Sequence, residues 1–127
     1  MDFIFSDTPN ELIFRDKEKQ KEIVFIYREP SADERIKYGS AIGSLFREKE
    51  ISEVKSEDIS KIQFQFGLDI LTGFRTNGVP TSISSDPESP QYNPDWKNLI
   101  ANRAPDLIIL LGQEIFETGG FSPEKNS

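Results

Sequence analysis

The sequence contains no cysteine and no histidine among its 127 residues. Without cysteine there is neither a disulfide framework nor a thiolate nucleophile. Without histidine the chain lacks the commonest general base, the commonest metal ligand and any Ser-His-Asp triad. We therefore predict a protein that is not an enzyme, with no catalytic residue, no cofactor and no metal site.

Long apolar runs and an excess of basic residues are also lacking. The longest apolar run covers residues 107–111, whereas a membrane-spanning helix needs about 20 residues. The opening residues, MDFIFSD, have no basic region of the kind that starts a signal peptide. The net charge of −7 repels nucleic-acid phosphates and anionic lipid. These features predict a cytoplasmic protein with no nucleic-acid partner and no membrane partner.

What the sequence does contain begins with a β-hairpin, predicted over about residues 12–27. Its second strand includes IVFIY (residues 23–27), where apolar side chains occupy both faces. A strand of this type is covered on both sides. Because a two-stranded hairpin is not stable alone, we expect it to pack on helices or to join another sheet.

Helices are predicted after the hairpin. Pro30 ends the second strand, and Ser31 with Glu34 forms a capping box. The helix that follows should cover about residues 32–46, with Tyr38 beside an inner stripe. That predicted stripe consists of Ile36, Ile42, Leu45 and Phe46, and close approach by another element is a plausible reason for Gly39 and Gly43.

Three further helices are predicted at about residues 57–71, 94–103 and 105–117. Gly73 is the expected stop of the first, and Asn93 with Pro94 is the expected start of the second. Residues 75–93, rich in Pro, Gly and Ser, form a long irregular loop between them. The predicted fold is thus α+β and mostly α, a single domain over residues 1–117 with a disordered tail at residues 118–127.

The acidic clusters have a structural explanation. Asp33 with Glu34 and Glu57 with Asp58 fall in the first turns of predicted helices, where carboxylates stabilise the helix dipole. The densest acidic stretch, residues 48–58, lacks the alternating ligands and central glycine of a calcium loop. We interpret these residues as caps and as a solvated helix face.

Two features are typical of interaction surfaces, although both can also simply build the core. One is the two-sided strand, whose edge can accept a strand from a neighbour. The other is the helix at residues 57–71 together with the end of the loop, because a helix that is apolar on two sides is central or lies at an oligomer interface. The candidate interaction residues are Phe25, Tyr27, Arg28, Phe64, Phe66, Tyr92 and Trp96.

Four motifs follow one another in a distinctive order. They read REPSADERIKY (residues 28–38), FGLDILTGF (66–74), YNPDWKNLI (92–100) and APDLIILLGQEIFE (104–117). Over about residues 12–117 the chain resembles the tail assembly chaperones of tailed phages and prophages, and related small tail proteins.

The resemblance implies a non-enzymatic protein of the bacterial cytoplasm that acts while the tail is built. Such a chaperone binds the tape-measure protein, helps tail-tube subunits (the major tail protein) to gather around it, and tends to self-associate into a homo-oligomer. Two alternatives stay open. One is an oligomeric structural component of the virion tail or a general interaction module, and the other is an enzyme that uses carboxylates with Lys or Arg alone.

Overall fold

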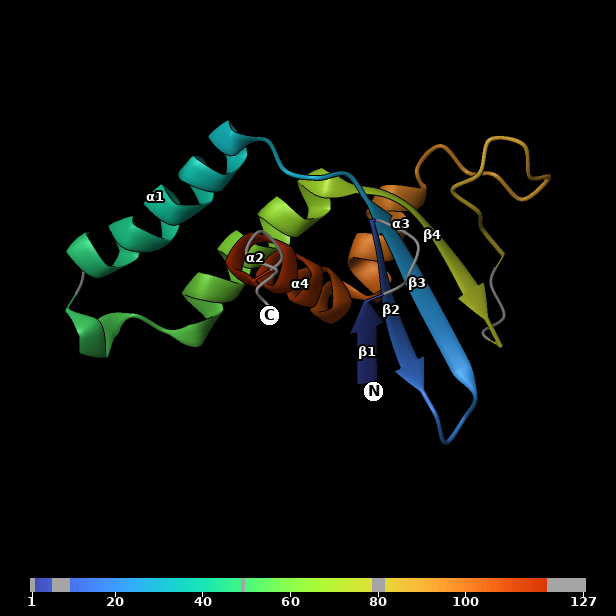
Figure 1. Cartoon of the computed structure of the whole chain (residues 1–127), viewed down its shortest axis with the longest axis horizontal. Helices are drawn as coiled ribbons and strands as arrows, with labels where there is room; N and C mark the ends of the chain where they lie inside the picture. The colour runs from blue at the N-terminus through green and yellow to red at the C-terminus, as the bar shows by residue number, and fades with distance from the viewer. Residues whose placement is uncertain (1, 6–9, 49, 79–81, 119–127) are drawn as a thin grey trace. The chain divides into compact units, whose positions relative to one another are not determined.

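The computed structural model describes residues 2–5, 10–48, 50–78 and 82–118 (Figure 1). Its contacts divide the chain into two compact units, each built from two separated segments. The sheet unit comprises residues 1–29 and 70–104, and the helical unit comprises residues 30–69 and 105–127. The predicted α+β class is confirmed, whereas the single domain stays a prediction. The tail predicted at residues 118–127 lies outside the described residues from residue 119 onward.

The sheet unit contains four antiparallel strands in the order β1-β2-β3-β4. They are β1 (Asp2–Phe5), β2 (Glu11–Asp16), β3 (Lys21–Tyr27) and β4 (Leu71–Asn77). The predicted hairpin, β2 with β3, is confirmed as the centre of this sheet (Figure 1). Strand β1 pairs with one side of the hairpin and β4 with the other, as expected for a hairpin that joins further strands.

One face of the sheet is the core of this unit. Phe25 pairs with Leu12 on one side and with Phe74 on the other, so the three side chains lie on the same face. All three are buried, and the Phe25 ring meets the Phe14 ring edge to face at 5.3 Å between centroids. Val24, on the opposite face, is also buried. Both faces of β3 are therefore covered at this point, as the apolar pattern predicts.

The β4 strand was not predicted. The sequence favoured a helix to residue 71, a stop at Gly73 and a loop from residue 75. Instead α2 (Ser56–Ile70) ends directly before β4, and Gly73 pairs with Ile26 inside the sheet. The reason lies in the tertiary structure. The apolar strand β3 needs a hydrogen-bonded strand at its second edge, and residues 71–77 (LTGFRTN) supply one with β-branched and aromatic side chains at alternate positions.

The segment after β4 is irregular from residue 82 to residue 95. A single parallel bridge joins Ser84 to Tyr92. The next helix, α3 (Trp96–Arg103), begins two residues later than predicted. Asn93 does not cap this helix: its side-chain oxygen accepts from the Asp95 amide at 2.8 Å, in a local turn that precedes it.

The helical unit begins at the predicted capping box. Ser31 Oγ accepts from the Glu34 amide at 3.1 Å, and the Glu34 carboxylate accepts from the Ser31 amide at 2.9 Å. The helix α1 (Ala32–Glu48) follows, then the short turn η1 (Ile51–Glu53) and α2. The last helix is α4 (Pro105–Gln113), which continues as the π-turn η2 (Glu114–Thr118). Within the described residues, no helix is both long enough and apolar enough to span a bilayer.

The inner stripe predicted for α1 was wrong for Ile36 and Phe46, whereas Ile42 and Leu45 are partly buried. Tyr38 is only 5% exposed, whereas Ile36 is 67% exposed and Phe46 is 45% exposed. Tyr38 stacks on Phe116 at 5.0 Å between ring centroids. This contact sets the rotation of α1 about its axis, which turns Ile36 outward.

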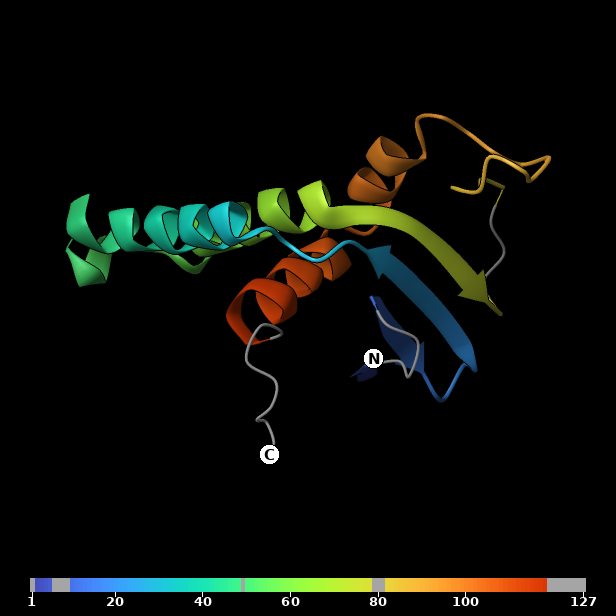
Figure 2. The same ribbon diagram turned by 45° about the horizontal axis from the view of Figure 1, so that its top comes forward.

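Helices α2 and α4 cross each other in close contact within the helical unit (Figures 1 and 2). A Cβ atom on Gly112 would lie 2.0 Å from the carbonyl oxygen of Gln63. One on Gly67 would lie 2.4 Å from the carbonyl oxygen of Ile108. Real Cβ atoms do not approach backbone so closely, so only glycine fits at both positions. We name this contact the glycine crossing.

The close approach predicted at Gly39 and Gly43 was wrong. In the described part of the chain, a Cβ atom on Gly39 would meet no atom within 4 Å. A Cβ atom on Gly43 would meet the side chain of Arg47 at 3.1 Å, which belongs to the same helix and is flexible. The sequence shows glycines in helices but not which of them touch another backbone.

We expect Gly112→Ala to lower the free energy of unfolding by about 3 kcal/mol or more, because the added methyl overlaps backbone that cannot move aside. Urea unfolding followed by circular dichroism measures this loss. The matched control is Gly39→Ala, measured at submicromolar protein concentration, which should raise stability by about 0.5–1 kcal/mol because it removes a flexible residue from a helix position that is open within the chain. Equal stability of Gly112→Ala and the unmodified chain would contradict the glycine crossing.

Candidate functional site

The seven candidate interaction residues are divided between the two units. Two lie on α2 in the helical unit, and five lie in the sheet unit. In the helical unit they are Phe64 and Phe66; in the sheet unit they are Phe25, Tyr27, Arg28, Tyr92 and Trp96.

The β3 candidates belong to the core. Phe25 is fully buried and Tyr27 is 7% exposed, so neither side chain presents a surface to a partner in this fold. Strand β3 also has no open edge, because β2 pairs with one side and β4 with the other. The edge of β3 at which we expected a strand of another protein to add is occupied by β4 of the same chain.

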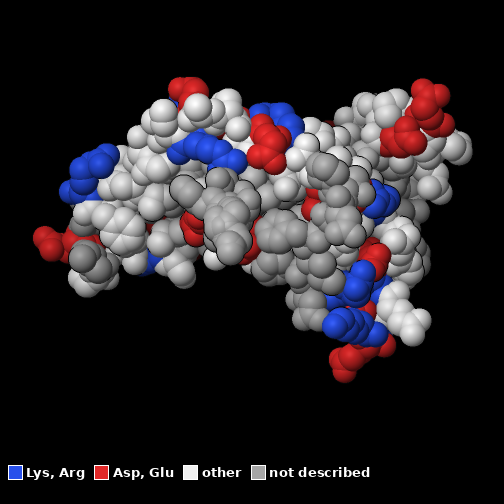
Figure 3. Space-filling model, viewed as in Figure 1, with Lys and Arg blue, Asp and Glu red and all other residues white. Residues whose placement is uncertain are grey.

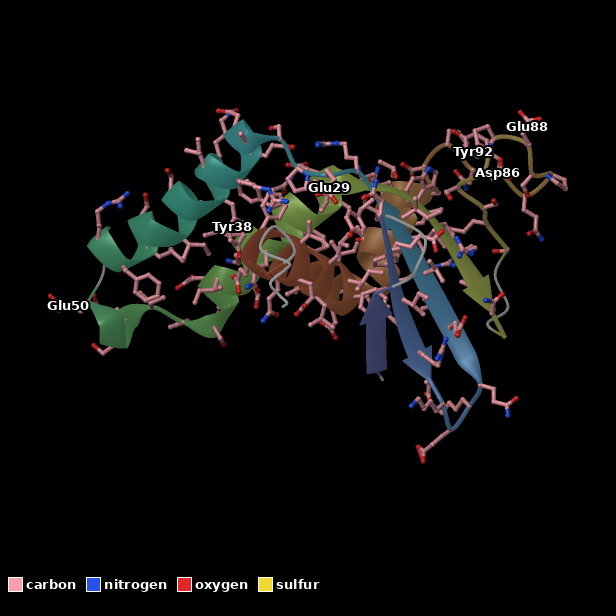
Figure 4. All side chains as sticks on the ribbon, in the orientation of Figure 1. Glu29, Tyr38, Glu50, Asp86, Glu88 and Tyr92 are labelled. Carbon is pink, nitrogen blue, oxygen red and sulfur yellow. The ribbon has the colours of Figure 1, made fainter. Side chains whose placement is uncertain are left out.

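The remaining candidates of the sheet unit are more accessible. The Arg28 amide donates to the carbonyl of Ile70 at 2.9 Å, and its side chain is exposed. Tyr92 is 39% exposed on the loop that precedes α3 (Figure 4). Trp96 is partly buried, with its ring 5.8 Å from the ring of Phe74. Among these three, Tyr92 and Arg28 are at the surface and Trp96 is partly in the core.

The second face of the sheet carries charged side chains that pair across the strands. Arg75 on β4 donates two hydrogen bonds to Glu11 on β2, at 2.7 and 2.9 Å, and so reaches across β3. The carboxylate raises the pKa of Arg75. The Glu11 side chain is nearly buried, so the contact with Arg75 offsets part of the cost of burying a carboxylate.

A second row of paired groups lies beside a small hollow of about 290 Å³. Arg15, Glu22 and Asn77 stand opposite one another on three neighbouring strands. Glu22 accepts from Asn77 at 3.0 Å and from Arg15 at 2.6 Å. The hydrogen bond from Asn77, followed by that from Arg15, lowers the pKa of Glu22 below its ordinary value of 4.5. These groups neutralise one another, which favours a structural role for the row.

The turn between β2 and β3 is also close to neutral. Figure 3 shows Lys and Arg side chains next to Asp and Glu side chains at this end of the hairpin. Alternation of sign cancels the local field over a short distance. The turn therefore offers no basic patch for a phosphate backbone.

One polar contact at the edge of β4 escaped prediction. The Ser85 hydroxyl accepts from the Phe74 amide at 3.0 Å and donates to the Phe74 carbonyl at 3.2 Å. Both backbone groups of Phe74 at this edge are thus occupied by one side chain. The sequence carries no specific signal for the contact, because the loop contains several serines that are equivalent by pattern.

An open hollow in the described residues lies in the helical unit. It is a shallow groove of about 520 Å³ between α2 and α4. Phe64, Pro105 and Ile109 supply its apolar lining, and Glu57 and Lys61 supply charge. An apolar groove with charged residues beside it is typical of surfaces that receive apolar side chains of a partner helix. Phe64, one of the candidate interaction residues, is therefore accessible in the structure.

Phe66 has a different environment from Phe64. Its ring meets those of Tyr38 and Phe116 at 5.3 Å between centroids in both cases. Figure 4 shows Tyr38 pointing from α1 toward the other helices of this unit. Phe66 therefore stabilises the packing of α1 on α2 and η2.

A small polar cluster sits next to these rings. The Tyr38 hydroxyl donates to the Glu117 carboxylate, and Gln63 Nε2 donates to the same carboxylate oxygen at 3.0 Å. Arg35 donates to the carbonyl of Ile115 at 3.1 Å. Burial, followed by the hydrogen bond to Glu117, raises the pKa of Tyr38. The cluster ties α1 to the end of the last helix.

The described residues hold no group of three or more Asp or Glu side chains that could bind a metal ion. What the geometry offers is an apolar groove and exposed apolar side chains, which suit binding of a protein. No protein-family model, no curated protein and no solved structure matches the chain.

We expect Tyr38→Phe to lower the free energy of unfolding at pH 7 by about 1 kcal/mol, through loss of one hydrogen bond. The raised pKa adds a dependence on pH. Tyr38 holds its proton more tightly in the folded chain, so its contribution is complete below pH 10 and is lost as the pH rises above 10.

Urea unfolding between pH 7 and pH 11 measures both effects. The difference between the unmodified chain and Tyr38→Phe should shrink as the pH rises above 10. Tyr92→Phe, a change at an exposed tyrosine, is the control and should alter neither quantity. A difference that stays constant over this range would contradict the assignment.

Proposed function

We propose that the chain is a non-catalytic tail assembly chaperone or adaptor of a tailed phage or prophage. It acts in the cytoplasm of the bacterial host, where it binds the tape-measure protein or the tail-tube subunits during tail assembly. It also self-associates. It does not act on nucleic acid or membrane.

The observation that carries the proposal is the series of four motifs between residues 28 and 117. Their order resembles that of the small tail proteins named above. The net charge of −7 and the absence of cysteine and histidine agree with a binding protein of the cytoplasm.

The groove between α2 and α4 supplies a physical means of binding. A tape-measure protein is a long helical protein, and an amphipathic helix presents apolar side chains at intervals of three and four residues. Phe64 and Ile109 line the groove and provide apolar area for such side chains. Glu57 and Lys61 have opposite charges, so they can orient a helix that carries matching charges along its flanks.

The proposal predicts that the tagged chain recovers virion proteins, with the tape-measure protein among them, from a lysogen that carries its phage. Phe64→Ser should reduce this recovery about tenfold or more, because aromatic residues in grooves commonly supply a large share of binding energy. Quantitative mass spectrometry of the captured proteins measures the change.

Glu88→Gln, on the exposed loop of the sheet unit, is the control and should leave recovery unchanged. Tyr92→Ser tests whether the exposed tyrosine contributes as well. Capture of no virion protein, together with a gene outside any phage cluster, would overturn the proposal. Presence of the chain in purified particles would favour the alternative of a structural tail component, since an assembly chaperone is absent from them.

A further inference from the structure

The outer side of α1 carries an apolar stripe that, within the described residues, is open except where the Arg47 side chain lies against Gly43. The stripe repeats every four and three residues, which is the spacing of a coiled-coil seam. Ile36 is 67% exposed and Phe46 is 45% exposed, the two largest exposures of big apolar side chains in the described residues. The outer stripe consists of Ala32, Ile36, Gly39, Gly43 and Phe46.

We infer that the outer stripe pairs with the same stripe of a second copy, as two antiparallel α1 helices related by a two-fold axis. This inference rests on the proposed function for self-association and names the surface that performs it. The surface differs from the two that the sequence predicted, which were the edge of the hairpin and the helix at residues 57–71 with the end of the loop.

The spacing of the stripe is self-complementary. Ile36 and Phe46 lie five residues to either side of position 41, and Gly39 and Gly43 lie two residues to either side of it. In an antiparallel pair centred there, Ile36 meets Phe46 of the second copy and Gly39 meets its Gly43. A two-fold interface requires this kind of correspondence. The glycines at the centre let the two backbones approach closely.

The charges beside the stripe complement one another in the same arrangement. The first turn of α1 carries Asp33 and Glu34, and its last turn carries Arg47. Figure 3 shows a basic patch at that end of the helix, with acidic side chains nearby. Antiparallel pairing brings Asp33 of one copy near Arg47 of the other, twice over, and opposes the helix dipoles. A parallel pair would instead place like charges together.

These charges have only weak partners within the chain. Asp33 pairs with Lys37 at 3.1 Å, and both side chains are about 70% exposed. Arg47 donates to the hydroxyl of Ser44 at 2.9 Å, in an exposed position. Exposed pairs of this type contribute little to stability, so both side chains are available for an intermolecular pair.

Sedimentation equilibrium of the purified full chain tests the pairing. Two helices of this length form an interface near the small end of the stable range, so we expect a dissociation constant in the micromolar range. Asp33→Arg alone and Arg47→Glu alone should each weaken the dimer about tenfold or more, because each creates like-charge contacts at both ends. The double variant should restore the dimer, because the pairs form again with exchanged signs.

Three controls separate pairing from folding. The double variant reverses the charges at both ends of α1, which lowers the stability of the single helix, so its rescue of the dimer is not a folding effect. Glu88→Arg makes the same change in net charge as Asp33→Arg, on a loop outside α1, and should not affect the dimer. Circular dichroism checks that each variant is folded.

A monomer at all concentrations up to about 1 mM would overturn the inference, because a dissociation constant above this limit corresponds to less than roughly 4 kcal/mol of binding. A dimer that neither charge reversal weakens would overturn it too. If the purified chain is a monomer and Ile36→Ser reduces the recovery of virion proteins, the stripe binds a partner instead of a second copy. Because the sedimentation experiment contains only the purified chain, a monomer there leaves the proposed binding of other tail proteins untouched.

Discussion

The helical unit depends on the backbone contact between α2 and α4 at Gly67 and Gly112. With no side chain between them, the two helices approach closely enough to share one aromatic cluster. That cluster fixes Tyr38, and Tyr38 fixes the rotation of α1. The same contact leaves Phe64 and Ile109 beside the open groove. The groove and the outward face of α1 therefore both follow from two residues that have no side chain.

In the sheet unit, the arrangement of the strands depends on pairs of side chains that meet across the strands. The apolar face buries the hairpin, while the other face holds Glu11 and Arg75 across β3. A nearly buried carboxylate is costly without a partner, so this pair favours the register in which β4 lies next to β3. A slip of β4 by one residue would turn Arg75 to the apolar face and leave the Glu11 carboxylate without this partner.

Local signals predicted much of the fold. The capping box at Ser31 and Glu34 gave the start of α1, and the apolar alternation of residues 23–27 gave a strand that is covered on both sides. Both depend on neighbours within a few residues. Strand β4 could not be predicted in this way, because its seven residues are stabilised by pairing with β3, which lies more than forty residues earlier. Local pattern carries no information on such a pairing.

The candidate site shows the same limit. The pattern shows Phe64 and Phe66 alike as apolar residues of a two-sided helix. In the structure Phe64 lines the groove, whereas Phe66 lies in the aromatic cluster. Phe25 and Tyr27 were chosen because their strand is apolar, and that same property places them in the core. For α1, periodicity gave a stripe but not its direction, which depends on the contact of Tyr38 with Phe116.

The hydroxyl of Ser85 has a consequence for the behaviour of the chain at high concentration. An edge strand with free amide and carbonyl groups is a template on which other chains can add, and this is a common route to aggregation. Ser85 engages both groups of Phe74, at the middle of β4. It does so with one side chain instead of a further strand. At this point of the edge, the amide and carbonyl of Phe74 are therefore not available to a strand of another chain.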